Sequence, residues 1–240
     1  MSMLSDIFWD IFSLFAPRTC PVCGEKLPRH NIAVCTLCEV TAPLTNLWQE
    51  SHNAMTERFW GILPVERAAA LFWYVDGSEW REAIHRIKYS GAWLAAYNLG
   101  RWYGTILKES GNFDDVDRVV AVPLHWARRM QRGYNQSEYI AKGIAHSLGV
   151  EADTRSVRRY RYNRSQTTRH KTERWDNVEG IFRVRSPKKL NGKHILLVDD
   201  VFTTGATILS LGETILKATT GCRLSVATLA ASRRGLGQKE

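Results

Sequence analysis

Two adjacent carboxylates, Asp199 and Asp200, lie between a strand-like run and a polar loop, and no other stretch has more specific chemistry. The apolar run Ile195–Val198 precedes them, and a loop of small and hydroxylated residues follows: Thr203, Thr204, Gly205, Ala206 and Thr207. Carboxylates accept hydrogen bonds from vicinal hydroxyl groups, and backbone N–H groups at the beginning of a helix bind anions. A ligand with a diol beside a phosphate, such as a ribose 5-phosphate, could bind its hydroxyl groups to the carboxylates and its phosphate to the loop.

The elements that position this stretch follow from hydrophobic spacing. After Thr207, apolar residues recur near the helical period, so the stretch predicts a buried strand, a loop and a helix. Similar patterns predict strands over 68–75, 118–124 and 223–230 and helices over 78–89, 92–108 and 137–148. Strands that alternate with helices indicate an α/β fold, with a mostly parallel sheet flanked by helices. Such sheets bind ligands at the carboxyl ends of their strands.

A second loop, rich in hydrogen-bond donors, follows the strand predicted over 118–124. It leads into the helix predicted over 137–148 and contains Arg128, Arg132, Asn135 and Gln136. Arginine guanidinium groups bind phosphate oxygens through two parallel hydrogen bonds. These residue types therefore suit a further phosphate group.

Four of the five cysteines form two C-x-x-C pairs, Cys20 with Cys23 and Cys35 with Cys38, with eleven residues between the pairs. Two such pairs build a tetrahedral four-sulfur site, which favours zinc in a structural role, with iron as the other metal that fits. A redox dithiol is the alternative, but two pairs this close together favour one shared metal. A site with four protein ligands has no open position, so we expect it to stabilise a small N-terminal module.

The composition indicates a folded chain with a basic balance. It has 240 residues, 44% of them hydrophobic, and a net charge of +9, which favours an anionic partner such as a nucleotide or nucleic acid. Residues 1–15 are apolar but include two aspartates and lack a basic region, so we do not expect a signal peptide. No stretch has the length of a membrane span. Because paired cysteines suited to a metal indicate a reducing compartment, we expect a cytoplasmic protein.

The strand, the acidic pair and the Thr-Thr-Gly-Ala-Thr loop resemble the signature that binds PRPP (5-phosphoribosyl 1-pyrophosphate) in type I phosphoribosyltransferases. Further motifs point to one family among these proteins. They are the run Arg132-Gly133-Tyr134-Asn135-Gln136, the pair Lys88-Tyr89, the stretch 166–182 and the N-terminal cysteine pairs. Together they resemble the ComF family of competence-associated, phosphoribosyltransferase-like proteins, over about residues 18–232.

The resemblance implies a type I phosphoribosyltransferase fold in which Asp199 and Asp200 bind the ribose hydroxyls and the threonine loop binds the 5-phosphate. It implies that Mg²⁺ binds with PRPP and that the pyrophosphate contacts Arg128, Arg132, Asn135, Gln136 and Lys88. The family's link to natural transformation implies a role in competence and DNA uptake, beside a helicase-like partner. The alternative is an active transferase of nucleotide metabolism with an unassigned nitrogen acceptor, and the residues leave turnover open.

Basic residues concentrate between positions 155 and 174, where eight cations accompany a single acid, Glu173. Type I phosphoribosyltransferases have a hairpin here that closes over PRPP, so the resemblance implies a basic flap of Arg158, Arg159, Arg161, Arg164, Arg169, Lys171 and Arg174. Because aromatic residues are interleaved, a second interpretation is contact with single-stranded DNA, with arginines on the backbone and rings on the bases. A solvated loop is the third.

On these grounds the chain divides into four parts. We expect an N-terminal amphipathic helix at 1–17, a zinc-binding cysteine module with a connector at 18–64, a phosphoribosyltransferase-like domain at 65–232 and a frayed, polar tail at 233–240. Residues 72–74 and the cysteine module would form the hood that recognises an acceptor.

Overall fold

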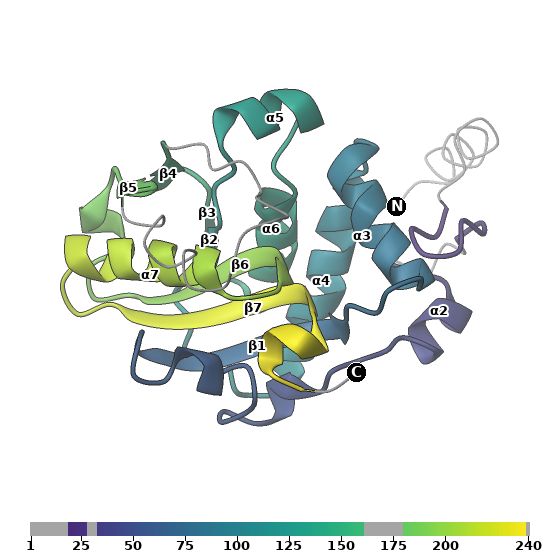
Figure 1. Cartoon of the computed structure of the whole chain (residues 1–240), viewed down its shortest axis with the longest axis horizontal. Helices are drawn as coiled ribbons and strands as arrows, with labels where there is room; N and C mark the ends of the chain where they lie inside the picture. The colour runs from purple at the N-terminus through teal and green to yellow at the C-terminus, as the bar shows by residue number, and fades with distance from the viewer. Residues whose placement is uncertain (1–18, 28–32, 161–179, 239–240) are drawn as a thin grey trace, which may run out of the picture.

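A five-stranded parallel sheet forms the centre of the molecule (Figure 1). The computed structural model describes residues 19–27, 33–160 and 180–238. The strand order is β1-β7-β6-β2-β3 and every neighbouring pair is parallel. The strands are β1 (Val65–Trp73), β2 (Arg118–Ala121), β3 (Glu151–Asp153), β6 (His194–Phe202) and β7 (Arg223–Ala231). The predicted α/β architecture is confirmed.

Both faces of the sheet are buried, because side chains of each strand point alternately to two cores. In β6, Leu196 and Val198 belong to one core and Ile195 and Leu197 to the other, and all four are fully buried. Strand residues alternate between faces, so a strand covered on both sides needs a continuous apolar run. The burial of each such side chain stabilises the folded state by about 1.5–3 kcal/mol. This strand is therefore firmly anchored before it reaches the two aspartates.

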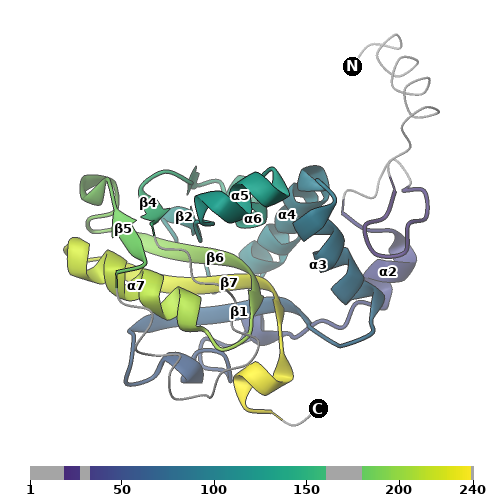
Figure 2. The same ribbon diagram turned by 45° about the horizontal axis from the view of Figure 1, so that its top comes forward.

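Helices cover the two faces. On one face lies α7 (Ala206–Ala218), and the other core includes α3 (Glu79–Tyr89), α4 (Trp93–Glu109) and α6 (Gln136–Leu148). Figure 2 shows α7 and the other three helices well apart, with the sheet between them. The connection from β2 through α6 and the connection from β6 through α7 therefore leave the adjacent strands β2 and β6 in opposite directions. Parallel sheets open a ligand-binding crevice at such a switch point.

Helices α4 and α6 approach each other closely through glycines. A Cβ atom on Gly100 would lie 2.3 Å from the carbonyl oxygen of Ile140, and one on Gly143 would lie 2.2 Å from the carbonyl oxygen of Tyr97. Only a residue without a side chain allows this backbone contact. The contact fixes the position of α6, whose first turn carries Gln136.

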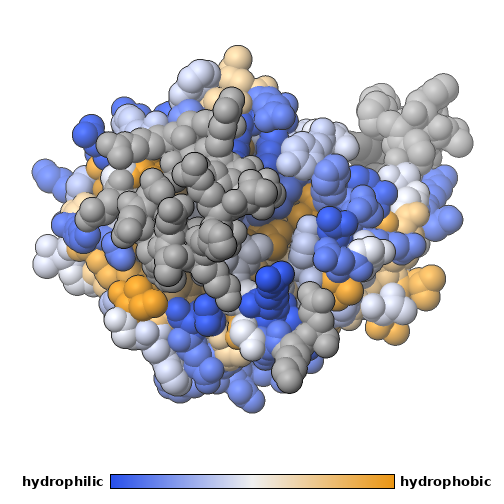
Figure 3. Space-filling model, viewed as in Figure 1, coloured by the Kyte–Doolittle hydropathy of each residue, from blue (hydrophilic) through white to orange (hydrophobic). Residues whose placement is uncertain are grey.

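The cysteine module packs against α3. Val22 and Cys38 are buried in the same core as Trp80 of α3, and Arg86 of α3 donates a hydrogen bond of 2.5 Å to the carbonyl oxygen of Val22. The second cysteine pair lies at the short helix α2 (Thr36–Val40), which exposes apolar side chains. Figure 3 shows them as an orange patch at the lower right, where Figure 1 places α2.

Two sequence predictions are wrong in local detail. The donor loop contains a helix, α5 (Trp126–Arg132), which ends at Gly133 in the left-handed conformation. The tail is not frayed where it begins, because Arg233–Leu236 form a 3₁₀ helix whose last residue is buried. The N–H of Ser232 also donates to the carbonyl oxygen of Phe202 at 3.0 Å. Packing against the sheet thus orders a segment that its polar composition alone would leave mobile.

The helices predicted over 78–89, 92–108 and 137–148 are confirmed as α3, α4 and α6, and the strands differ from their predictions only at the ends. A separate antiparallel pair consists of β4 (Val157–Arg159) and β5 (Phe182–Val184). The N-terminal helix predicted at 1–17 lies outside the described residues, and so do five of the predicted flap residues: Arg161, Arg164, Arg169, Lys171 and Arg174. In the described part of the chain, no helix is long and apolar enough to cross a membrane.

Candidate functional site

A cavity of about 280 Å³ opens at the switch point, where β2 and β6 end. Ala121 of β2 lies opposite Val198 of β6, and β2 ends there while β6 continues beside β7 to Phe202. Residues 122–124, which follow β2, and residues 199–201 of β6 both line the cavity. The other lining residues are Tyr74, Lys88, Arg128, Arg132, Asn135, Gln136, Ser137, Arg159, Thr203 and Thr207. The structure therefore brings the acidic pair, the donor loop, Lys88 and one flap arginine to one place.

Each aspartate of the pair is held through one oxygen. Asp199 Oδ1 accepts hydrogen bonds from Ser137 Oγ and from the N–H of Asp200, both at 2.9 Å. Asp200 Oδ2 accepts a hydrogen bond of 2.6 Å from Gln136 Nε2 and lies 3.3 Å from Lys88 Nζ. None of the described residues hydrogen-bonds to the second oxygen of either carboxylate. Each aspartate thus keeps one acceptor oxygen for a ligand.

Burial raises the pKa of Asp199 to about 7, and the negative charge of Asp200 adds to the increase. The hydrogen bond from Ser137 and the charge of Lys88 act in the opposite direction. A pair that resists carrying two negative charges favours a ligand that brings hydroxyl donors or a cation. Sequence reasoning did not select Ser137 as a site residue, and its only signal was its position beside Gln136.

The threonine loop joins β6 to the N-terminus of α7. Thr203 and Thr207 line the cavity, whereas the three residues between them do not. Gly205 precedes the helix with φ of 76°, and a Cβ atom there would lie 2.9 Å from the ring of Phe202, so the position requires glycine. Gly235 of the C-terminal turn packs on the loop, because its Cβ position lies 1.8 Å from the carbonyl oxygen of Thr203. The N-terminus of α7 carries a partial positive charge, so the backbone N–H groups of its first turn suit an anion.

The Arg-Gly-Tyr-Asn-Gln run and the Lys-Tyr pair lie against each other. Arg132 donates a hydrogen bond of 3.3 Å to the hydroxyl of Tyr89, and its guanidinium lies 4.9 Å from the centre of that ring. The hydroxyl of Tyr134 donates to the carbonyl oxygen of Ile87. Lys88 is thereby held beside the cavity by contacts on both of its neighbours in the chain.

Asn135 has a structural part in the site. Its side-chain oxygen accepts a hydrogen bond of 3.2 Å from the N–H of Ser137, and its Nδ2 donates to the carbonyl oxygen of Val122 at 3.0 Å. The first contact caps α6 and the second ties it to the end of β2. Asn135 therefore positions the two side chains that hold the aspartates.

Arg128 of α5 and Arg159 of β4 line the cavity together. Burial and the charge of Arg128 lower the pKa of Arg159. The Nε atom of Arg159 is buried and has no hydrogen-bond partner among the described residues. Two neighbouring guanidinium groups, one of them incompletely paired, suit an anion such as pyrophosphate.

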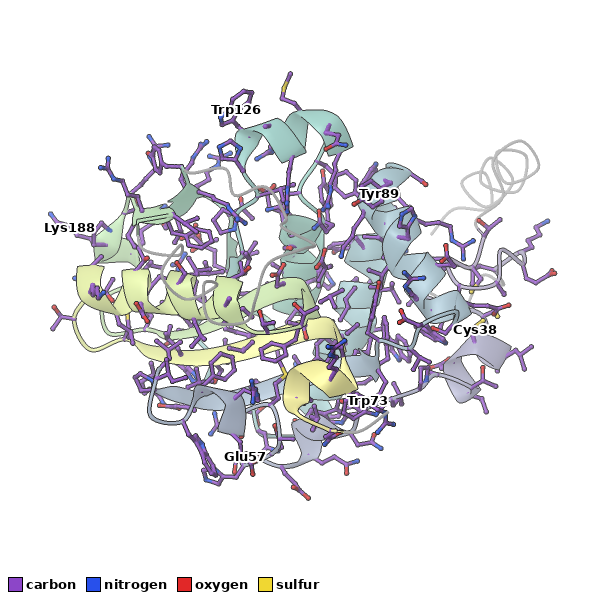
Figure 4. All side chains as sticks on the ribbon, viewed as in Figure 1. Cys38, Glu57, Trp73, Tyr89, Trp126 and Lys188 are labelled. Carbon is purple, nitrogen blue, oxygen red and sulfur yellow. The ribbon has the colours of Figure 1, made fainter. Side chains whose placement is uncertain are left out.

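Only one of the three residues predicted as an acceptor hood is placed to serve it. Tyr74 lines the cavity, whereas Phe72 is fully buried in β1. Trp73 packs under the guanidinium of Arg233, 4.4 Å from the ring centre, and Figure 4 shows it beside the C-terminal turn. Strand alternation and the C-terminal turn thus leave Tyr74 as the candidate contact to an acceptor.

The four cysteines predicted as ligands form one cluster. Their Sγ atoms all lie within 4.8 Å of one another, and those of Cys23 and Cys35 are 3.6 Å apart. Against the effect of burial, hydrogen bonds from the backbone of Cys23 and Cys35 lower the pKa of Cys20 to about 7, whereas burial raises the pKa of Cys23 and of Cys38. Four sulfur atoms this close together are the donor set that zinc prefers in a structural site, so the cluster could hold a zinc ion.

Comparison with known proteins agrees with this geometry. A model of the family described as phosphoribosyl transferase domain matches residues 135–240. DNA utilization protein YhgH of Salmonella typhimurium is 36% identical over 137 residues, which cover 56% of this chain and 60% of that protein. Competence protein ComFC of Bacillus subtilis is 27% identical over 230 residues, which cover 93% and 89% of the two chains. The chain spans 44% to 60% of the length of the YhgH proteins that it matches.

Among solved structures, adenine phosphoribosyltransferase from Saccharomyces cerevisiae shares 15% identity with a TM-score of 0.38, over 61% of this chain and 75% of that one. The parallel sheet, the acidic pair at its switch point and the matched domain define a type I phosphoribosyltransferase fold. Within that class, the likeness to the competence and DNA utilization proteins supports the predicted resemblance to the ComF family.

Proposed function

We propose that this protein binds PRPP, or a related ribose 5-phosphate ligand, together with Mg²⁺, and that it does so in competence and DNA uptake. The observation that carries the proposal is the single cavity shared by Asp199, Asp200, the threonine loop and the arginines. A ribose diol would donate to the available carboxylate oxygens, and the threonine loop and α7 would bind the 5-phosphate. The relatives' names, which refer to competence and DNA utilization, support the cellular role.

The residues present fit Mg²⁺ in part. The ion takes oxygen ligands, and each aspartate offers one available carboxylate oxygen beside the cavity. When bound, the ion would neutralise charge between the acidic pair and the pyrophosphate of the ligand. Arg128, Arg132 and Arg159 would orient the pyrophosphate from the other side.

The test is a calorimetric titration of PRPP with Mg²⁺ into the whole chain. The double variant Asp199→Asn, Asp200→Asn loses two hydrogen bonds to charged groups, so we expect affinity to fall by about 100-fold or more. Asp114→Asn is the matched control, because this aspartate is exposed and does not line the cavity. Equal PRPP affinity in the double variant and in the wild type would refute the assignment.

The same preparation tests whether binding leads to transfer. An active transferase would release pyrophosphate when its nitrogen acceptor is added, whereas a binding module would release none with any acceptor. A panel of purines, pyrimidines and amines therefore separates the two functions, and Tyr74→Ala should change acceptor affinity only if transfer occurs.

Single-stranded DNA is the second partner that we propose, and exposed aromatic rings where α3 ends and α4 begins support it. Tyr89 and Trp93 are 51% and 50% exposed, and the ring of Trp93 lies 5.5 Å from that of Tyr139. Cations accompany these rings, since Lys142 Nζ lies 4.7 Å from the centre of Tyr139 and Arg132 stacks on Tyr89. Bases stack on such rings while cations bind the phosphates.

Removing one ring tests this surface. Trp93→Ala should weaken binding of single-stranded DNA by about tenfold, the worth of one stacked base, and leave PRPP affinity unchanged. Trp60→Ala is the control, because Trp60 is 60% exposed in a different segment. Figure 4 shows Tyr89 at the end of the molecule where Trp126 projects from α5, so Trp126→Ala tests how far the surface extends. Equal loss in the Trp60 and Trp93 variants would refute a local DNA surface.

We further propose that the metal in the cysteine cluster is zinc, in a structural role, because four sulfur donors leave no open coordination position. Elemental analysis of the purified chain tests the identity of the metal against iron. A helicase-like DNA-uptake protein is the proposed protein partner, and co-purification of the two proteins tests that association.

A further inference from the structure

The ammonium group of Lys88 contacts the acidic pair, at a place where a metal ion could otherwise neutralise the negative charge of the two aspartates. Its Nζ is 3.3 Å from Asp200 Oδ2, and the two side chains are only 21% and 10% exposed. Lys88 belongs to the last turn of α3, whereas Asp200 lies near the end of β6, so tertiary packing alone brings them together. A partly buried ammonium group is stabilised by a partner of opposite charge, so this ion pair forms part of the cavity lining.

The cavity also holds more cations than anions. Four cationic side chains line it against two carboxylates: Lys88, Arg128, Arg132 and Arg159. Mg²⁺ requires oxygen contacts of about 2.0–2.1 Å in a near-octahedral arrangement. The oxygen Oδ2 of Asp200 already accepts a hydrogen bond of 2.6 Å from Gln136 in addition to the ammonium contact. A metal ion on this oxygen would have to displace two donors.

We propose that Lys88 is the built-in cation of this site, so that a ribose 5-phosphate group binds without a metal ion and Mg²⁺ enters only with a pyrophosphate-bearing ligand. The inference rests on the proposed function, since it assigns the cation requirement of that same cavity. Lys88 acts as a positioning residue, because it neutralises Asp200 and leaves the other carboxylate oxygen to the sugar. Gln136 Oε1 is buried without a hydrogen-bond partner among the described residues and adds an acceptor for a ribose hydroxyl.

The test uses the whole chain and ribose 5-phosphate, which has no pyrophosphate, titrated in EDTA and in excess Mg²⁺. We expect the wild-type affinity to differ by less than about threefold between the two conditions. Lys88→Met keeps the aliphatic stem but removes the charge, so its affinity should fall by about tenfold or more in EDTA and recover with Mg²⁺. Lys88→Arg should retain binding in EDTA. Lys108→Met, at an exposed lysine in the last turn of α4, should change nothing.

Two results would overturn the inference while the proposed function survives. One is a wild-type protein that binds ribose 5-phosphate only with Mg²⁺. The other is a Lys88→Met variant whose affinity falls equally in both conditions, since a merely structural lysine gives that result. If the wild type binds neither ribose 5-phosphate nor PRPP in either condition, the proposed function fails, and this inference fails with it.

Discussion

The variant Asp199→Asn should make the folded protein more stable in mildly alkaline solution while it weakens ligand binding. The asparagine side chain keeps the oxygen that accepts the hydrogen bonds from Ser137 and from the N–H of Asp200. It removes the negative charge that burial and the charge of Asp200 disfavour. The negative charge of the acidic pair, to which we assign ligand binding, should therefore lower the stability of the folded protein.

The sign follows from the pKa of Asp199, which is about 7 in the folded protein against an ordinary value of 3.8. Between these values the unfolded chain has lost the proton while the folded chain retains it, so the free energy of unfolding decreases as the pH rises. Above about pH 7 the decrease is complete. The difference between the two pKa values corresponds to a loss of about 4 kcal/mol at most in the free energy of unfolding. Because Asp199 lines an open cavity, solvent would screen the repulsion, so we expect about 1–2 kcal/mol.

Urea unfolding at about pH 5 and about pH 8 measures this difference. The wild type should lose more stability between the two conditions than Asp199→Asn does, and the variant should be the more stable protein at the higher pH. Asp114→Asn, at an exposed aspartate, should follow the wild type. A variant that is destabilised equally at both pH values would show that the carboxylate pair is not under electrostatic strain.

Three further predictions concern other parts of the molecule. Gly143→Ala would place a Cβ atom 2.2 Å from the carbonyl oxygen of Tyr97, so it should lower the free energy of unfolding by about 2 kcal/mol or more; unchanged urea unfolding would contradict the close contact of α4 and α6. Gly235→Ala would place a Cβ atom 1.8 Å from the carbonyl oxygen of Thr203, so it should displace the threonine loop, lower the thermal stability and weaken PRPP binding; calorimetry and thermal unfolding measure the two effects, and unchanged PRPP affinity would show that the C-terminal turn does not position the loop. Cys20→Ser should lose bound metal and lower the thermal stability, whereas Cys222→Ser, outside the cluster, should retain the metal and the stability of the wild type. An equal metal content of the two variants by elemental analysis would contradict the four-cysteine metal site.

The predicted elements agree with the structure where their signals are local and strong. The apolar run Ile195–Val198 becomes the centre of β6, and the helical spacing after Thr207 becomes α7. Helix α5 was missed because its seven residues include no buried side chain, so it has no apolar periodicity to detect. The ordered C-terminal turn was missed for a related reason, since the contacts of Gly235 and Leu236 lie on elements that are distant in the sequence.

The sequence by itself determined the residue types of the candidate site and the cysteine spacing suited to a metal. Asp199, Asp200 and the threonine loop are nearly consecutive, and each cysteine pair lies within one turn, so local geometry fixes their relations. Only the tertiary structure decided which groups act on the acidic pair. Ser137, Gln136 and Lys88 come from other elements, brought to the end of β6 by the strand order and the close contact of α4 with α6. Such pairings depend on how distant surfaces pack, and hydrophobic period and turn chemistry report only on neighbours in the chain.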